Sequence, residues 1–232
     1  RLGWLIPFSW FSEFHIGVQN ANGETMASFL ANEEFFDERP IGNKPFVDRG
    51  VKNLKDLVHL ARLDNSWDLT DDVTMKLGFS GLYGPNATGA DGETYIYGSD
   101  LVVKWRPADN VRGWPFLVFE SEVMKRDYKA AAFSSTSNNL PAETLKDLGL
   151  YTQLLYGFSP GWAAGLRYEY VTGSGESVGG RDSDPFRDDR SRISPLLIWM
   201  PTEFSRFRIQ YNYDRADHLP DKEAHSAWLG VE

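Results

Sequence analysis

Apolar and polar residues alternate along most of this chain, and aromatic residues stand at both ends of the alternating segments. Tryptophans flank the short connections between segments, namely Trp67, Trp105, Trp114, Trp162 and Trp199. Tyrosines flank the long connections, namely Tyr83, Tyr95, Tyr97, Tyr128, Tyr168, Tyr170, Tyr211 and Tyr213. These side chains gather where one end is apolar and the other is wet, as at both interfaces of a bilayer. Two aromatic levels joined by alternating strands predict an all-β, antiparallel, up-and-down transmembrane β-barrel.

Ten segments show the two-residue period of β-strands, each with one consistently apolar phase. They cover about 8–20, 58–69, 73–84, 94–106, 115–127, 146–158, 161–171, 191–200 and 205–214, and the tenth begins near His225. Pro195 weakens the eighth segment, because proline gives up a ladder hydrogen bond. The connections alternate between short and long, which places all long loops at one end of the sheet. In an outer-membrane barrel that end is extracellular.

The longest connection, residues 20–57, is unusually long for a structureless loop. Within it, residues 24–36 are compatible with a short helix and residues 53–60 with another helical turn. We therefore expect 20–57 to be an extracellular loop that folds over the barrel mouth or into it.

Bulk composition argues against nucleic-acid partners, cysteine-based sites and membrane-spanning helices. The 232 residues carry a net charge of −9, whereas a nucleic-acid partner requires a basic surface, so none is predicted. The chain has no cysteine, which rules out disulfides and thiolate metal sites. It has no apolar run of about 18 residues, so no membrane-spanning helix is predicted.

A soluble up-and-down barrel or a β-sandwich would show the same alternation, with its apolar phase turned inward. Two features favour the membrane interpretation. The polar phases mix Arg, Asp, Glu and Lys with Gly and Ser, which suits a confined, salt-bridged lumen. The aromatic residues also sort by strand end, which a soluble core gives them no reason to do.

The polar phases supply the candidate lumen-facing residues, which are Glu13, His15, Arg62, Asp64, Lys76, Asp100, Lys104, Glu120, Glu122, Arg126, Arg167, Glu169, Arg206 and Arg208. Rings of charge select solutes in pores. The same residues would also suit a salt-bridge lattice that closes a narrow barrel, since about ten strands enclose a space filled by side chains, whereas 16 or more leave a channel. Two functions stay open: a channel or receptor for small solutes or ions, gated by the 20–57 loop, and a closed barrel that serves as a scaffold in an envelope complex.

Metal and enzyme sites have weaker support. The four histidines, His15, His59, His218 and His225, form no HExxH or i, i+4 pair, so no zinc site is predicted. The acidic loop 181–190 lacks EF-hand spacing and is interleaved with arginines, which favours ion pairing within the loop over calcium binding. No acid–histidine pairing can be predicted from spacing, so neither an enzyme nor a cofactor is expected.

Several short motifs stand out beyond the strand pattern. They are GVQNANG (17–23), GPNATG (84–89), DPFR (184–187), RISP (192–195), PTEFS (201–205) and QYNYD (210–214). Together they resemble the C-terminal barrel part of bacterial outer-membrane proteins labelled TonB-dependent-receptor-like or zinc-regulated outer-membrane receptors. The resemblance spans most of the chain and its motifs are structural. It implies an outer-membrane location, contact with lipid, small solutes or other envelope proteins as partners, and TonB-powered uptake. Contact with lipopolysaccharide is a weaker prediction from the acidic loops, through bridging divalent cations.

The chain also departs from that family. A TonB-dependent receptor has an N-terminal plug domain, a TonB box and about 22 strands. We find none of these here, and the last strand stops at Glu232 without the aromatic residue that usually ends such a barrel. We therefore expect residues 1–232 to be one barrel domain that lacks N-terminal strands and the end of its last strand.

Overall fold

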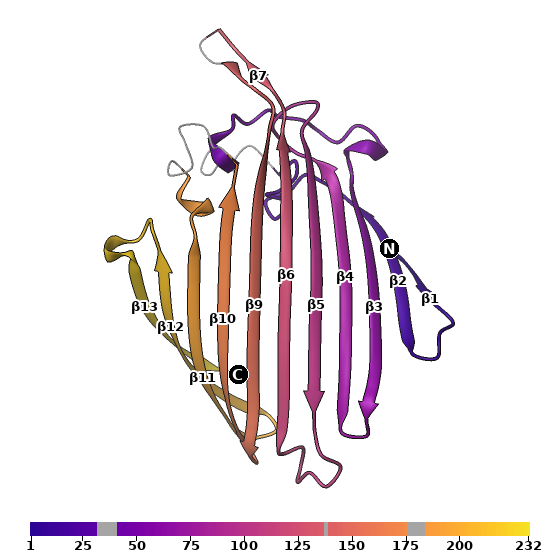
Figure 1. The fold of residues 1–232 in the computed structure, drawn as a ribbon, viewed down its shortest axis with the longest axis vertical. Coiled ribbons are helices and arrows are strands. Elements are labelled where there is room, and N and C mark those ends of the chain that lie inside the picture. The colour runs from indigo at the N-terminus through magenta and orange to yellow at the C-terminus, as the bar shows by residue number, and fades with distance from the viewer. Residues whose placement is uncertain (32–40, 137–138, 176–183) are drawn as a thin grey trace.

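The computed structural model describes residues 1–31, 41–136, 139–175 and 184–232, and in them the chain forms one large antiparallel sheet (Figure 1). Eleven strands pair in sequence order, apart from the small β7–β8 hairpin, which stands outside the sheet. The sheet strands are β1 (Leu2–Leu5), β2 (Phe11–Gln19), β3 (Val58–Thr70), β4 (Val73–Pro85), β5 (Glu93–Trp105), β6 (Phe116–Ala130), β9 (Glu143–Ser159), β10 (Trp162–Ser174), β11 (Arg190–Thr202), β12 (Ser205–Ala216) and β13 (Glu223–Val231). The hairpin consists of β7 (Phe133–Ser134) and β8 (Asn139–Leu140).

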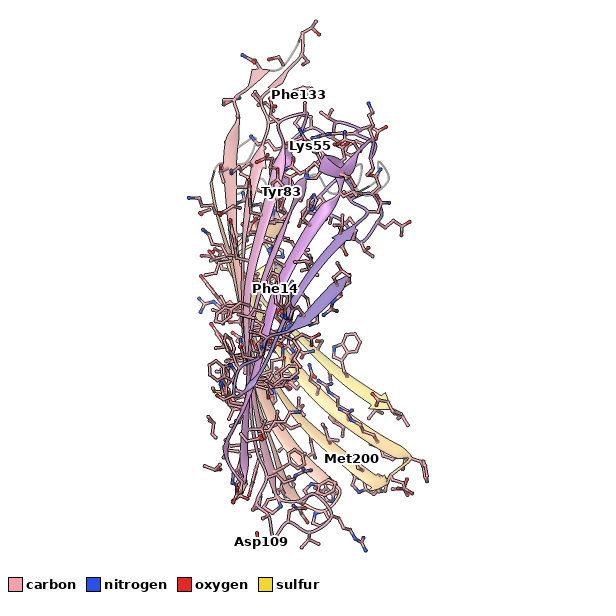
Figure 2. All side chains as sticks on the ribbon, turned by 90° about the vertical axis from the view of Figure 1, so that its right-hand side faces the viewer. Phe14, Lys55, Tyr83, Asp109, Phe133 and Met200 are labelled. Carbon is pink, nitrogen blue, oxygen red and sulfur yellow. The ribbon has the colours of Figure 1, made fainter. Side chains whose placement is uncertain are left out.

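All ten expected strands are present, and the structure adds β1, which pairs with β2. β11 runs through Pro195, and its recorded pairing with β12 passes from Ile193 directly to Leu196. The described residues leave the sheet open, with β1 and β13 as its edges. Seen edge-on, both edges bend toward the same side (Figure 2).

The connections alternate in length as expected. The short turns lie together at the lower end in Figure 1, and the long connections lie at the upper end. Asp71 and Asp72 join β3 to β4, and Pro160 and Gly161 join β9 to β10. Gly161 has a φ of +80°, and a Cβ atom there would lie 2.7 Å from the carbonyl oxygen of Met200. Only glycine fits such a turn against a neighbouring strand.

Where the structure describes them, the long connections contain short 3₁₀ turns and no α-helix. These are η1 (Ile41–Asn43), η2 (Leu54–Asp56), η4 (Pro185–Arg187) and η5 (Pro220–Lys222). The helix expected over 24–36 is wrong for residues 24–31, which form turns, and residues 32–36 lie outside the described part. The turn expected over 53–60 is confirmed only at its start, as η2, where the Asn53 side chain accepts from the Lys55 amide and caps the turn. Residues 58–60 belong to β3 instead.

Buried apolar clusters lie near both ends of the sheet, and those at the upper end involve the 20–57 segment. Ala21, Phe29 and Leu30 pack on Val58 at the start of β3. Tyr128, Ala130 and Leu145 form a second cluster, which contacts Ile41. Near the short turns, Ala163, Leu196 and Ile198 pack against Phe116. The central strands carry no second layer in the described residues.

Candidate functional site

One face of the sheet carries all fourteen candidate lumen-facing residues. Directly paired residues on neighbouring strands share a face, so the register assigns it. One row of paired positions crosses the sheet from β2 to β12 and includes six carboxylates, which we call the acidic row. Its members are Glu13, Asp64, Asp100, Glu122, Glu169 and Asp214, with Gly78, Tyr151 and Arg192 at the intervening positions. We call this side of the sheet the charged face.

Arg62 is the main cation of the acidic row on the N-terminal side. Its guanidinium lies 2.7 Å from the Asp64 carboxylate and 2.8 Å from the Asp100 carboxylate. It also donates to the Ser80 hydroxyl at 2.7 Å. The side chain thus reaches from β3 across β4 to β5. Gly78 on β4 makes this possible, because a Cβ atom there would stand 2.3 Å from Asp100 Oδ2 and 2.5 Å from Arg62 Nη2.

His15 belongs to the same part of the row. Its Nε2 atom lies 3.3 Å from Glu13 Oε2 and 3.7 Å from Asp64 Oδ2, and the residue is buried. Its ring nitrogen therefore faces two carboxylates, one on its own strand and one on β3.

A second ion-pair chain continues along the row on the C-terminal side. Arg167 Nη2 lies 2.8 Å from Glu169 Oε1, and its guanidinium stands 4.1 Å above the Tyr151 ring. Arg192 bridges Glu169 at 4.0 Å and Asp214 at 2.9 Å. Arg190 adds a contact of 2.7 Å to Asp214.

Above the acidic row, Arg126 forms a triad with Asp147 of β9 and Arg187 of η4. Asp147 on β9 accepts from Arg126 at 2.7 Å and from Arg187 of η4 at 2.9 Å. Arg126 Nη1 also donates to the Ser28 hydroxyl at 2.8 Å, which ties the 20–57 segment to the charged face.

The remaining candidate residues make fewer hydrogen bonds and ion pairs. Glu120 accepts a 3.4 Å hydrogen bond from Gln153, and the Glu122 carboxylate makes no hydrogen bond or ion pair with the described residues. Lys76 and Lys104 are exposed near the short turns. Arg208 donates to Gln210, and Arg206 Nη1 lies 3.6 Å from Glu232. Charge on the charged face is therefore densely paired near Arg62, Arg126 and Arg192 and sparsely paired at Glu120, Glu122 and near the short turns.

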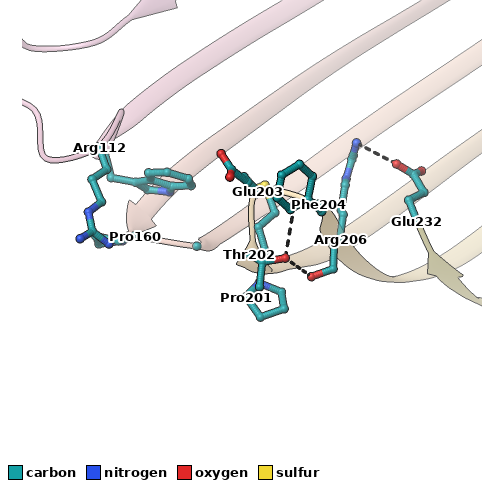
Figure 3. Close-up of a pocket in the computed structure, with 12 residues that line it drawn as sticks. Arg112, Pro160, Pro201, Thr202, Glu203, Phe204, Arg206 and Glu232 are labelled. Atoms are coloured by element: carbon teal, nitrogen blue, oxygen red, sulfur yellow. Dashed lines mark hydrogen bonds and ion pairs between the residues drawn. The ribbon is translucent and has the colours of Figure 1, made fainter.

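Near the short turns, Arg206 lines an open hollow of about 970 Å³ (Figure 3). Trp114, Pro160 and Glu232 contribute to its wall. Phe204 stands at the tip of the β11–β12 turn and is 87% exposed.

The opposite face, which we call the apolar face, carries nearly all the expected interface aromatics. Near the short turns, the Trp162 and Trp199 rings stack at 5.7 Å, and Trp67 packs beside Trp10. Trp105 also lies near this end of the sheet, while Trp114 lies in the β5–β6 turn and donates to the Trp162 carbonyl. Toward the long loops the register places Tyr83, Tyr95, Tyr97, Tyr168, Tyr170, Tyr211 and Tyr213 on this face.

Tyr128 does not belong with these aromatics. It shares the parity of Glu122 and Arg126 on β6, so it lies on the charged face, where it is 1% exposed beside Leu145. Its burial comes from the core that forms above the acidic row.

The described parts of the 20–57 segment are fastened to the charged face and to the loops beside it. Thr94 Oγ1 donates to the Ser28 carbonyl at 2.6 Å. The buried Lys44 ammonium lies 2.8 Å from Glu143 of β9. The Val47 amide donates to the Ala87 carbonyl at 2.8 Å. These contacts place the described parts of the segment on the charged face near its upper end.

Asp56 holds the last part of this segment. Its carboxylate accepts from the Lys52 and Asn53 amides, both at 3.1 Å, and lies 2.9 Å from Arg49. The hydrogen bond from the Lys52 amide is the largest cause that keeps the pKa of Asp56 below its ordinary value of 3.8, against the opposing effect of burial.

Strand parity would have found several charged-face residues that the sequence prediction omitted. Asp214 lies in the same phase of β12 as the predicted residue Arg208. Arg192 is paired with the predicted residue Glu169, and Arg190 shares the phase of Arg192 on β11. Asp147 likewise shares a phase with Gln153 on β9. Their ion-pair partners lie on other strands, which parity alone does not reveal.

The four histidines lie apart. His218 contacts Asp188 at 3.4 Å, His225 contacts the Tyr211 hydroxyl and His59 contacts the Leu54 carbonyl. Within the described ranges, no group of three or more His, Asp or Glu residues is arranged to hold a metal ion. The expected ion pairing within 181–190 is wrong for Arg190, which pairs with Asp214 of β12. Arg187 pairs with Asp147 of β9, and residues 181–183 lie outside the described part.

In the part that the structure describes, no helix is both long and apolar enough to cross a bilayer.

Residues 175–179 spell GESVG, which has the GxSxG spacing of a serine nucleophile elbow. That elbow requires a strand-to-helix turn on an α/β sheet. Here the sequence follows an antiparallel strand, and residues 176–179 lie outside the described part.

Comparisons with known proteins give limited information about this chain. No protein-family model matches it, and no solved structure matches it. An uncharacterized protein from Aquifex aeolicus (strain VF5) is 32% identical over 131 residues, which are 56% of this chain. The matched segment spans only 26% of that relative's own length.

Proposed function

We propose that this chain supplies strands of a transmembrane β-barrel in a bacterial outer membrane, and that its charged face lines a path for small solutes or ions. The observation that carries the proposal is the inverted polarity of the sheet. Large apolar side chains on the apolar face are widely exposed, including Leu166 at 54%, Ile209 at 58% and Phe79 at 48%. A soluble sheet covers such a face with a second layer, whereas lipid covers it in a barrel.

The two aromatic levels support the same conclusion. They bracket the exposed apolar band, as the girdles of outer-membrane barrels do. Tyr83 and Tyr95 both donate their hydroxyls to Glu93, so their apolar rings stand below a polar rim. The long loops would then be extracellular and the short turns periplasmic. An open sheet of eleven strands fits a barrel to which further strands contribute, and the relative from Aquifex aeolicus is much longer than the matched segment.

In this proposal the 20–57 segment narrows the extracellular end of the path. Its contacts through Ser28, Lys44 and Val47 fasten it at several points. It therefore acts as a fixed constriction in this state, and gating requires these contacts to open. The family resemblance implies uptake powered by TonB, and the energy for transport would then come from outside the 20–57 segment.

A closed scaffold barrel is the second candidate, and the dense ion pairing around Arg62 and Arg192 favours it. Such a lattice holds neighbouring strands together without any need for a water-filled path.

Single-channel conductance of the full-length protein in a planar bilayer distinguishes the two candidates. We expect discrete ion-selective openings whose cation permeability falls in the variant that combines Glu120→Gln and Glu122→Gln. The matched control is Lys125→Gln, which removes a charge from the apolar side of the same strand. A protein that is folded by circular dichroism but electrically silent would support the scaffold.

A further inference from the structure

A hollow of about 280 Å³ lies on the charged face between the acidic row and the Arg126 triad. Its walls include Ile96, Met124, Gly149 and Val171, which we call the apolar trough. Met124 is paired with Gly98 on β5 and Gly149 on β9, and Gly149 is paired with Val171 on β10. The two glycines leave the space on either side of Met124 without a side chain.

The apolar trough is unusual for its surroundings. Met124 is 47% exposed and Val171 is 43% exposed, although most neighbours on this face are charged. Exposed thioether and aliphatic groups in a water-lined path favour a ligand that removes them from water.

The charged side chains on the rim above the apolar trough form ion pairs with other residues of the protein. Arg126 and Arg187 both contact Asp147, and Asp188, which also lines the hollow, contacts His218. The 20–57 segment adds a roof, because Ile96 packs against the cluster of Ala21, Phe29 and Leu30, and Arg126 donates to Ser28.

A carboxylate that does not itself line the hollow lies on the same face of β6, toward the acidic row. Glu122 precedes Met124 by two residues on β6, so both side chains lie on the charged face about 7 Å apart. Asp100 beside Glu122 is engaged by Arg62, and Tyr151 on its other side is covered by Arg167. Among the described residues nothing neutralises Glu122 by a hydrogen bond or ion pair.

We propose that the apolar trough and Glu122 form a binding site for a small amphipathic cation, with its apolar body on Met124 and Val171 and its cationic group on Glu122. The inference rests on the proposed function, since it places the site in the solute path. It adds a substrate class to that function: organic ammonium compounds with a short hydrocarbon part.

Three probes of equal chain length test the site, namely butylammonium, 1-butanol and butyrate. Each is added to the full-length protein in a planar bilayer, and block of the current is measured. Butylammonium should block at the lowest concentration. Replacing Met124→Thr together with Val171→Thr should weaken its block about fivefold, since each buried methylene contributes about 0.8 kcal/mol. Val102→Thr, on the same face about 13 Å from Gly98, is the matched control and should change nothing.

The charge requirement is tested separately. Glu122→Gln should reduce the advantage of butylammonium over butanol about threefold, as expected for one partly exposed ion pair. It should leave the block by butanol unchanged. Equal block by butyrate and butylammonium, or wild-type block in the Met124–Val171 double variant, would overturn the inference.

Failure of the inference differs from failure of the proposed function. Saturation-transfer NMR of the same probes, with the protein in lipid nanodiscs, reports binding without conductance. A silent protein that binds butylammonium through Glu122 and Met124 keeps the site and rejects the channel. A conducting protein with no binding that depends on these residues keeps the channel and rejects the site.

Discussion

The two faces of this sheet are built from the same strands, yet they meet their surroundings in opposite ways. On the charged face, Arg62 reaches over Gly78 to pair with Asp100, and buried clusters form beneath the 20–57 segment. On the apolar face, side chains such as Leu166 and Ile209 are more than half exposed and contact no second layer in the described part. Many side chains of the charged face are thus held by contacts within the protein. Those of the apolar face are covered by no second layer in the described part, so their packing depends on what surrounds the protein.

Charge placed on either face tests this contrast most strongly. Leu166→Arg puts a guanidinium on the apolar face of β10, where 54% of the leucine is exposed. If lipid covers that face, the free energy of unfolding from lipid vesicles should fall by about 2–4 kcal/mol. Val102→Arg on the charged face is the matched control and should cost about 1 kcal/mol or less. Denaturant titration of both variants measures the difference, and a neutral Leu166→Arg would place water on the apolar face.

A second test breaks the organisation of the charged face. Gly78→Ala adds a Cβ atom where Asp100 Oδ2 would be 2.3 Å away, so the Arg62–Asp100 pair must separate. We expect a loss of about 1–2 kcal/mol in the free energy of unfolding, from strain together with the lost ion pair. Gly81→Ala on the same strand is the control, since its Cβ meets nothing within 4 Å. Equal stability of the two variants would show that Arg62 does not depend on the gap above Gly78.

The sequence predicted the faces well, because alternation encodes which side of a strand each residue occupies. Glu13, Asp64, Asp100 and Glu122 fall on one face from their phase alone, and the acidic row follows once the register is known. The register itself depends on turn geometry, so the reach of Arg62 across β4 had no signal in the sequence.

Residues at the upper end were harder to predict, because their partners come from loops. Tyr128 followed the aromatic pattern of the interface, yet it is buried in a cluster with Ala130 and Leu145, against which Ile41 of the 20–57 segment packs. Tyr128 and Arg126 share one phase of β6, and that phase correctly predicts that Tyr128 lies on the charged face. Arg187 pairs with Asp147 from a loop whose path no periodicity describes.

Ion selectivity tests the contrast without changing the fold of the sheet. Arg206→Glu together with Arg208→Glu reverses two charges on the charged face near the short turns. If these side chains border the path, the permeability ratio of cations to anions should rise. The control reverses Lys125 and Lys129, which lie on the apolar side of β6 and are each 49% exposed. Reversal potentials under a salt gradient measure the ratio, and an unchanged ratio in the Arg206–Arg208 variant would count against their facing the path.

The smallest effect concerns the loop that the charged face holds. Because the pKa of Asp56 is lowered on folding, its ionised form stabilises the 41–57 segment. That stability is complete above the ordinary pKa of 3.8 and is lost as pH falls through the lower folded value. The Lys52 and Asn53 amides donate directly to this carboxylate, so their protection from hydrogen exchange, corrected for intrinsic rates, reports it. Protection should hold at pH 5–7 and weaken below about pH 4.

Asp56→Asn separates this effect from other carboxylates that titrate in the same range. The amide side chain cannot ionise, so the two amides should be less protected at pH 6 and should lose their dependence on pH. Because Asp56 lies in the 20–57 segment and not on the sheet, the strands should keep their own protection in this variant. A pH profile identical to that of the wild type would mean that another group, such as the Glu143 partner of Lys44, fastens the segment instead.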